Sequence, residues 1–485
     1  MKKTKLALAI ASVALASSQA HATNGMNMDG YGPIATAMGG AASAYDNGLA
    51  GMMSNPATIM MDSGDGSTFQ IALGNLRPNV TSTMPTMPDA KSAADSFFMP
   101  GMGYATKDGK LTWGVGMMAQ GGMGTQFEGT SFLAAGTGEE VMSQVGVGRL
   151  GLPVNYAVND KLTIGGSVDF VWAGMDIKMA VGGGYLKSSA NGGLVDTAGS
   201  SASFAGFVGL VDAGTTQANG SVTGVDLSGA GASPNSTVFN GRFDFADGSD
   251  YTGEAKGTGL GGKLGFTYKV DSNTTFGASY HTKTNISDLT TSNASMSMTI
   301  DAGAGAATSV MTGDITVKDF QWPATIAFGL STQVNDKWKV NADFKRIGWE
   351  EVMSGFNMDF TVTDNTQVAG FGISNGDKIA VAMPQNWEDQ NVIMLGAQYQ
   401  YSDKLALRAG ANLSNNPIPD TTLNALFPAI IEKHYTAGFG YAMSDNSAVD
   451  FSLTYAPEVV ATNSMTNIGS KHSQISWQAM YTRNW

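Results

Sequence analysis

Short segments with alternating apolar and polar residues occur along most of this chain. In residues 161–172, Leu162, Ile164 and Phe170 fall on one face, whereas Ser167 and Asp169 fall on the other. Successive side chains of a β-strand point to opposite faces, so each segment predicts a strand with one apolar and one polar face. The pattern returns in residues 263–270, 323–334, 337–345, 392–401, 405–413, 435–441 and 449–455. About fourteen to sixteen segments of this kind predict an all-β protein.

Two architectures use such strands: a soluble β-sandwich, and a membrane barrel that turns its apolar face toward lipid. The connections at residues 158–161, 335–337 and 402–404 are short and polar, and the opposite strand ends carry long loops. Tyr399 and Tyr401 lie near a strand end, as in the aromatic girdle at a membrane interface. These features predict a transmembrane antiparallel β-barrel in the outer membrane of a Gram-negative bacterium.

The C-terminal segment alternates up to the last residue. Its apolar face carries Ile475, Trp477, Ala479, Tyr481 and Trp485. A last strand with an aromatic end resembles the signal that the barrel-insertion machinery reads, although many outer-membrane proteins end in Phe. We therefore expect that machinery as a partner, recognising the strand that ends in Trp485.

The N-terminus has the pattern of a secretory signal peptide. Three lysines within the first five residues precede an apolar run at residues 6–16, and Ala20 and Ala22 fit a signal-peptidase site. The apolar run is too short to span a bilayer. We expect residues 1–22 to be removed on export.

Two regions lack the alternation. Residues 23–62 include a run of small residues at 33–42 and predict a compact plug, here called the hatch. Residues 181–256 are rich in Gly, Ser, Ala and Asp and predict long external loops. The expected organisation is a signal peptide at 1–22, the hatch at 23–62 and the barrel at 63–485.

Composition excludes several functions. Charged residues make up 14% of the chain, against about 25% in a typical soluble domain. The net charge of -13 argues against a nucleic-acid partner, and the chain has no Cys. His21, His281, His434 and His472 are scattered without the spacing of metal ligands. We therefore expect no metal and no cofactor.

Three enzyme-like patterns occur in unsuitable surroundings. Residues 146–151 and 257–262 match the glycine spacing of a dinucleotide site, but neither opens a helix after a strand. Residues 372–376 match a nucleophile elbow, with Ser374 in a polar loop. A chain with 63 Gly yields such matches by chance, so we expect no enzyme.

A set of ordered motifs points to one family. Asn55-Pro56-Ala57 resembles the hatch motif of the FadL/TodX outer-membrane transport family. Further motifs follow the family pattern in order: residues 30–33, 38–41, 45–47, 322–323, 395–403, 407–410, 417–420, 426–430 and 455–457. The resemblance covers the hatch and the C-terminal third, whereas residues 180–310 match only in being loop-like.

The resemblance implies a barrel of about fourteen strands whose lumen the hatch plugs from the periplasmic side. Members take up hydrophobic molecules past lipopolysaccharide, through an external groove and an apolar pocket, and release them sideways through a gap in the wall. The main hypothesis for this chain is passive uptake of long-chain fatty acids. Aromatic or aliphatic hydrocarbons are the alternative cargo. A structural or adhesive barrel acting through residues 181–256 and an unplugged porin are further alternatives.

Candidate site residues follow from the resemblance and from side-chain chemistry. Asn55, Pro56 and Ala57 suit a rigid wedge against a kinked strand, because Pro56 fixes φ and Asn55 can cap a turn. Seven of the 28 methionines fall in residues 23–62, and Met adapts to varied apolar ligands. The expected hydrophobic ligand path comprises Met38, Leu49, Met52, Met53, Ile59 and Met60.

A fatty acid also needs a partner for its carboxylate. Lys339, Lys345 and Arg408 lie on the polar face of predicted strands and are the candidate carboxylate partners. The alternative for each is to balance a lumenal acid such as Asp343.

Overall fold

The computed structural model describes residues 24–188, 194–196, 237–245, 255–301, 306–367 and 374–485. The expected signal peptide, residues 1–22, lies outside them. Among the described residues, no helix combines the length and hydrophobicity needed to cross a bilayer.

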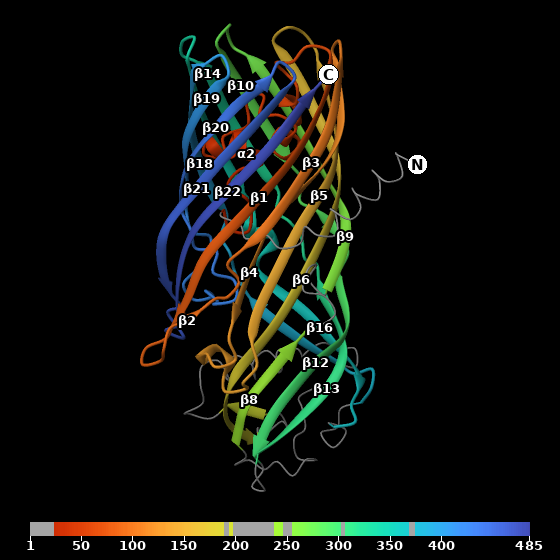
Figure 1. Cartoon of the computed structure of the whole chain (residues 1–485). Coiled ribbons are helices and arrows are strands. Elements are labelled where there is room, and N and C mark those ends of the chain that lie inside the picture. Colours follow the sequence, from red (N-terminus) through yellow and green to blue (C-terminus); the bar gives the residue numbers. More distant parts are fainter. Residues whose placement is uncertain (1–23, 189–193, 197–236, 246–254, 302–305, 368–373) are drawn as a thin grey trace.

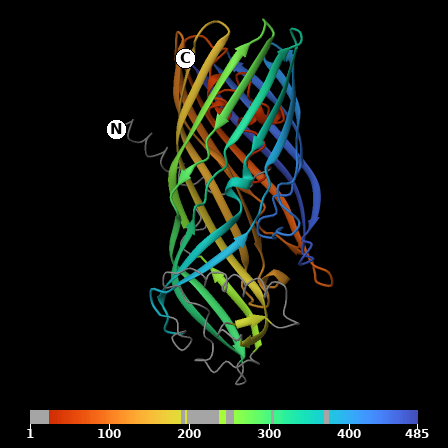
Figure 2. The same cartoon turned by 180° about the vertical axis from the view of Figure 1, so that it is seen from behind.

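The strands form one antiparallel sheet of 22 segments. Those that make up the wall are β1 (Gly66–Thr83), β3 (Phe97–Asp108), β4 (Leu111–Phe127), β5 (Val141–Ala157), β6 (Leu162–Ser188), β9 (Ala255–Lys269), β10 (Thr274–His281), β14 (Thr325–Gln333), β15 (Trp338–Ile347), β18 (Gln390–Ser402), β19 (Leu405–Ser414), β20 (Lys433–Ser444), β21 (Ser447–Thr462) and β22 (Gly469–Asn484). Each pairs with the next in this order, and β22 pairs with β1, so the wall closes into a barrel (Figures 1 and 2).

The remaining segments lie outside this ring. They are β2 (Ala90–Lys91), β7 (Leu194–Asp196), β8 (Thr237–Asp244), β11 (Asn285–Ile286), β12 (Leu289–Asp301), β13 (Ala306–Lys318), β16 (Gly355–Asp364) and β17 (Lys378–Pro384). β6 continues into a second sheet region in the order β8, β12, β13, β16 and β17, at the lower end of Figure 1. The sheet has more strands than the expected number of about fourteen, because the sequence interpretation did not include this extension.

The other end of the barrel carries short turns with a repeated construction. Asn159 accepts hydrogen bonds from the backbone N–H groups of Lys161 and Leu162, both at 2.9 Å. Asp271 and Asn335 each accept hydrogen bonds in the same way, from the N–H groups two and three residues further along the chain. Asn and Asp commonly stabilise turns in this way. Short turns face the periplasm in outer-membrane barrels, so the opposite end, with the sheet extension, is external.

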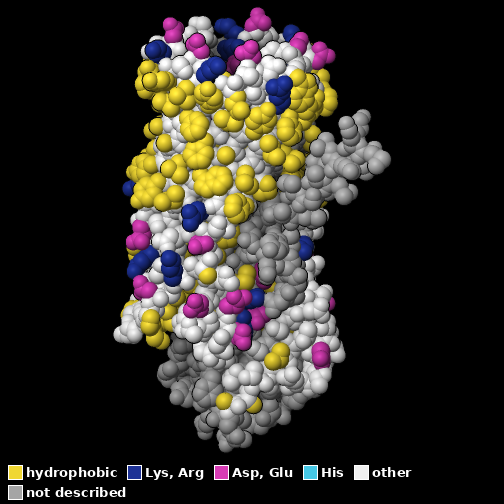
Figure 3. Space-filling model, in the orientation of Figure 1, with side chains coloured by type: hydrophobic (Ala, Val, Ile, Leu, Met, Phe, Trp, Pro, Cys, Tyr) yellow, Lys and Arg dark blue, Asp and Glu magenta, His cyan; other side chains and the backbone are white. Residues whose placement is uncertain are grey.

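The outer surface separates into two zones along the barrel. On the face that Figure 3 shows, a broad apolar belt crosses the half nearest the short turns, and the external half is largely polar. Alternate residues of the wall form the belt; in the C-terminal strand Ile475 and Tyr481 are exposed, whereas Ser476 and Thr482 are buried. The predicted alternation and its outward apolar face are confirmed.

The structure corrects the prediction for residues 181–256. Residues 181–188 belong to β6 and residues 237–244 form β8, so the expected loop at 181–256 is wrong for these positions; its other residues, apart from β7 and the start of β9, lie outside the described residues. The glycines of 146–151 and 257–262 lie within β5 and β9.

Candidate functional site

The hatch lies within the barrel near the short turns (Figure 1). It contains α2 (Gly32–Ala37), η1 (Ala50–Met53) and η2 (Pro56–Thr58), joined by irregular backbone. Pro33 and Pro56 each occupy a first helical turn, where a missing N–H is tolerated. Most hatch side chains are buried, and α2 packs against β19 to β22.

Small residues let the hatch backbone approach the wall closely. Gly39 has φ +70° and lies against the carbonyls of Leu395 in β18 and Ala411 in β19. Gly410 faces the backbone of Gly39, where a Cβ atom would overlap. The hydroxyl of Thr436 in β20 accepts a hydrogen bond from Gly39 N–H at 3.1 Å. The motifs at residues 38–41, 395–403 and 407–410 thus meet at one contact.

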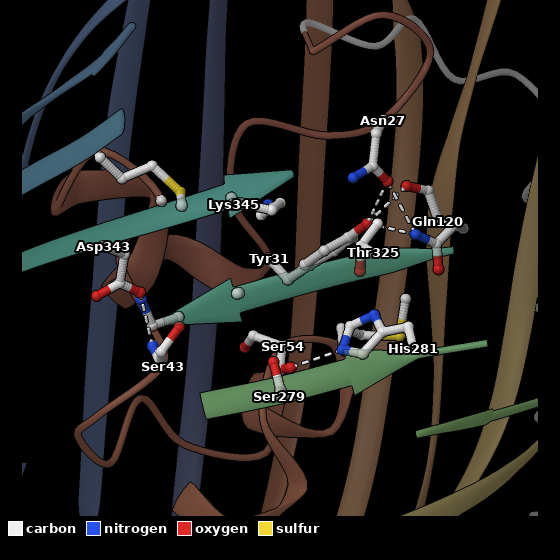
Figure 4. A pocket seen from close by; sticks show the side chains of 16 residues that line it. Asn27, Tyr31, Ser43, Ser54, Gln120, Ser279, His281, Thr325, Asp343 and Lys345 are labelled. Carbon is white, nitrogen blue, oxygen red and sulfur yellow. Dashed lines mark hydrogen bonds between the residues drawn. The ribbon is translucent and has the colours of Figure 1, made fainter. Parts of the chain in front are cut away.

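Asp343 of β15 holds the next hatch segment. Its Oδ2 atom accepts hydrogen bonds from the N–H groups of Ala42 and Ser43, both at 2.8 Å (Figure 4). The side chain is 6% exposed, and Lys345 on the same strand contributes a favourable charge interaction. A carboxylate that satisfies two buried N–H groups fixes this part of the hatch.

The Asn55-Pro56-Ala57 motif forms a third attachment. Asn55 caps η2 through Ala57 N–H, and its Nδ2 donates to the carbonyls of Ser43 and of Phe266 in β9. Asn155 of β5 donates to the carbonyl of Pro56 at 3.0 Å. The motif therefore packs against β5, β6 and β9. The sequence analysis expected a kinked strand beside this motif, but the irregular strand of the wall is a different one.

That irregular strand is β4. It pairs with β3 only from Leu111 to Met118, whereas β3 starts at Phe97 and β4 runs to Phe127. A bulge between Ala119 and Gly121 bends β4 at the point where the pairing with β3 stops. The result is a slit in the wall between β3 and β4.

The hatch supplies the hydrogen bonds that β3 does not. Gly122 N–H donates to the carbonyl of Met26 at 2.9 Å, and Tyr31 Oη donates to the carbonyl of Gln120 at 3.0 Å. The Gln120 side chain donates to Asn27 and Tyr31 (Figure 4). Unpaired backbone groups are costly at membrane depth, so these contacts stabilise a wall that is open on the β3 side.

A methionine-rich apolar cluster lies behind the slit. It joins Met28, Tyr31 and several other hatch residues to Leu76, Phe97, Met99 and Met118 of the wall. Of the expected ligand path, Leu49, Met52, Met53, Ile59 and Met60 belong to this cluster. Met38 does not, because it lies against Gly396 of β18 on the opposite side of the hatch.

The space at the slit is small. A cavity of about 30 Å³ is lined by Met28, Tyr31, Met99, Met118 and Ala119, among others. A volume of this size holds at most about two water molecules. Cargo can pass this point only if the methionine side chains or the hatch move.

Each expected carboxylate partner has a neighbour in the structure. Arg408 pairs with Asp450 at 2.7 Å and donates to Gln398. Lys339 lies 5.8 Å from the ring centre of Tyr45 in the hatch. Lys345 lines a polar cavity together with Asp343 (Figure 4).

A second charged cluster was not predicted. Arg149 of β5 and Lys263 of β9 both pair with the single carboxylate of Asp169 in β6, and all three are buried. The alternation of apolar and polar positions puts each of the three residues on the polar face of its strand. Their convergence depends on the pairing of β5, β6 and β9, which the sequence does not reveal.

The external side of the lumen is filled by apolar side chains. Residues 415–432, between β19 and β20, fold inward and bury Ile418, Leu426 and Phe427. We call this segment the inner loop. Its carbonyls accept hydrogen bonds from side chains of the surrounding wall, among them Thr125 in β4, Ser143 in β5 and Asn463 after β21. The inner loop therefore places buried apolar side chains between the hatch and the external end of the barrel.

No group of three or more His, Asp or Glu residues suited to a metal ion occurs among the described residues.

A family model described as outer membrane protein transport protein (OMPP1/FadL/TodX) matches residues 7–483. The toluene transporter TodX of P. putida has a similar structure, with a TM-score of 0.75 and 28% identity over 94% of this chain and 99% of TodX. For the toluene transporter TbuX of Ralstonia pickettii, the TM-score is 0.69 and the identity 27%, with the same coverage. A FadL homologue of Pseudomonas aeruginosa shares the fold, with a TM-score of 0.62 and 14% identity over 95% of this chain and 99% of that protein.

One curated relative matches a shorter stretch. An uncharacterized protein of Chlorobium limicola, from the 5′ region of a phosphoenolpyruvate carboxykinase gene, is 37% identical over 81 residues. The match spans 17% of this chain and 40% of that relative.

Proposed function

This chain belongs to the OMPP1/FadL/TodX family of outer-membrane transport channels, and we propose that its cargo is a monoaromatic hydrocarbon such as toluene. It is an outer-membrane β-barrel for hydrophobic compounds and not an enzyme, as the sequence resemblance indicated. The main expectation of a long-chain fatty acid is less well supported than its hydrocarbon alternative. TodX and TbuX, the similar structures with 28% and 27% identity, are toluene transporters.

The observation that carries the proposal is the apolar cluster at the slit. Methionine and other apolar side chains pack directly behind the slit between β3 and β4 and line the small cavity there. Flexible thioether side chains adapt to a small apolar solute and offer nothing to a charged headgroup. A hydrocarbon without a polar end suits this lining.

We further propose that cargo leaves sideways, from the cluster through the slit into the outer membrane. The slit opens on a wall whose neighbouring strands carry the apolar belt, so released hydrocarbon enters lipid and not water (Figure 3). Such transfer is favourable at about 25 cal/mol per Å² of apolar surface removed from water. It requires a concentration gradient and no other energy source.

One observation favours a fatty acid as a second candidate cargo. Arg149 and Lys263 share one carboxylate, so the cluster keeps one unit of positive charge inside the barrel. A fatty-acid carboxylate that reached this point would find a matching charge.

Uptake of labelled toluene and labelled oleate separates the two candidates. Cells that lack the protein are compared with the same cells producing it, at matched amounts of folded barrel in the outer membrane. The proposal expects restored toluene uptake and little oleate uptake. Oleate uptake that is lost in Lys263→Gln, with no toluene uptake in either strain, would instead support the fatty-acid candidate.

A further inference from the structure

Three neighbouring wall strands carry a tryptophan close to their external ends. Trp322 lies three residues before β14, Trp349 lies in α4 (Trp349–Val352) just after β15, and Trp387 lies three residues before β18. Because β14, β15 and β18 are paired in this order, their three external connections lie side by side. Each connection folds its tryptophan inward.

The three indole rings form a continuous stack of edge contacts. The centroids of Trp322 and Trp349 are 5.5 Å apart and those of Trp349 and Trp387 are 5.3 Å apart, with interplanar angles of 73° and 70°. Each residue is at most 1% exposed. This is the edge-to-face geometry that aromatic rings prefer, and a single-ring solute can replace or extend it.

One end of the stack lies near both the inner loop and the slit. Phe427 of the inner loop contacts Phe356, which contacts Phe320, two residues before Trp322. The ring of Trp322 itself lies against Gly121 at the bulge of β4. Trp322 is therefore the member of the stack that borders the irregular strand beside the slit.

Two indole N–H groups in the stack have no hydrogen-bond partner among the described residues. They are Nε1 of Trp322 and Nε1 of Trp387. Nε1 of Trp349, in contrast, donates to Oε1 of Gln390 at 3.4 Å. A buried donor without a partner is costly, because it has given up its hydrogen bonds to water. An acceptor that reached Trp322 or Trp387 would remove that cost.

We propose that this tryptophan stack is a binding site for aromatic cargo that carries a hydrogen-bond-accepting oxygen, such as an aryl ketone or aryl ester. The ring of the cargo packs edge-to-face on the indoles, and Nε1 of Trp322 or Trp387 donates to its oxygen. The inference rests on the proposed function, since it assumes aromatic cargo, and it extends the cargo from hydrocarbons to their oxygenated derivatives.

Acetophenone and ethylbenzene test the site, because they have nearly the same shape and differ in one carbonyl oxygen. The measured quantity is the ratio of their uptake rates, which does not depend on the amount of barrel. In the double variant Trp322→Phe/Trp387→Phe we expect this ratio to fall about fivefold to tenfold, as one hydrogen bond of about 1 kcal/mol or more is lost. Trp349→Phe is the matched control, since its N–H already has a partner, and should change the ratio less than about twofold.

The outcomes separate binding from folding. The urea midpoint of the purified double variant is measured beside that of Trp349→Phe, because each change from indole to phenyl removes buried volume and lowers stability whether or not cargo binds. An unchanged ratio in the double variant, or an equal fall in Trp349→Phe, would overturn the site while leaving hydrocarbon uptake intact. If the unaltered protein transports neither ethylbenzene nor toluene, the proposed function fails first.

Discussion

The hatch meets the barrel in two different ways on its two sides. Toward β15, β19 and β20, wall side chains such as Asp343, Asn412 and Thr436 hydrogen-bond to hatch backbone. Toward β3 and β4, the contact is largely methionine and other apolar side chains, with hydrogen bonds at Gln120, Gly122 and Lys107.

The difference has a mechanical meaning. Hydrogen bonds to backbone fix position and orientation, because their strength depends on distance and angle. Contacts between methionines are non-directional and survive rearrangement of flexible side chains. The side with directional bonds therefore holds the plug in place, and the methionine side beside the slit can rearrange for cargo.

The largest effect is expected from removing the fixed side. Asp343→Ala leaves the N–H groups of Ala42 and Ser43 buried without a partner, which costs about 3 kcal/mol. The loosened hatch should admit ions, so conductance in planar bilayers should rise. Asp336→Ala, in an exposed turn beside β15, is the control. Unchanged conductance and an unchanged urea midpoint would show that Asp343 does not hold the hatch.

A truncation on the methionine side should act differently. Met52→Ala removes a buried side chain from the cluster and should lower the free energy of unfolding by about 2 kcal/mol. Ion conductance should stay low, whereas toluene uptake should rise as space opens near the slit. Met443→Ala, at an exposed position, controls for loss of a methionine. A rise in conductance equal to that of Asp343→Ala would remove the distinction between the two sides.

The Asn55 attachment should have a smaller effect. Asn55→Ala removes the cap of η2 and the donor to Ser43 and Phe266, and should lower the free energy of unfolding by about 1 kcal/mol. Asn55→Asp keeps the cap but sets a buried carboxylate oxygen against the carbonyls of Ser43 and Phe266, so its loss in urea unfolding should exceed that of Asn55→Ala. An Asp variant as stable as the unaltered protein would show that the amide donor does not hold this part of the hatch.

The smallest effect concerns pH. Burial raises the pKa of Asp29, in the hatch, from 3.8 to about 6. Because the native state binds this proton more tightly than the unfolded chain, Asp29 adds stability as the pH falls through about 6, by less than about 1 kcal/mol between pH 7 and pH 5.5. Asp29→Asn should lack this gain in urea titrations at the two pH values. Equal slopes in both proteins would contradict a raised pKa.

The alternation of apolar and polar residues within short segments was enough to predict the barrel wall. The alternation in segments such as residues 475–485 depends only on neighbouring positions, and lipid on one face enforces it. The extension formed by β8, β12, β13 and β16 escaped prediction in part because β8 lies in a stretch rich in Gly, Ser, Ala and Asp without regular alternation, although its Phe243 is buried.

The site was predicted in part for the same reason. The methionines of the hatch are neighbours in sequence, and Leu49, Met52, Met53, Ile59 and Met60 do cluster. Met38, Arg149 and Lys263 depend on which distant strands meet, a property of ring closure that no local pattern encodes. The pairing of Arg408 with Asp450 likewise required β19, β20 and β21 to be placed together.

The most direct test of the account closes the slit. The chain has no Cys, so Met99→Cys and Met118→Cys provide a unique thiol pair on the two strands that border the opening. A reducible thiol-to-thiol cross-linker then bridges β3 and β4 in cells, and toluene uptake is measured before and after reduction. If cargo leaves through the slit, cross-linked barrels lose most of their toluene uptake and reduction restores it. Uptake that continues unchanged in fully cross-linked barrels would contradict release through the wall between β3 and β4.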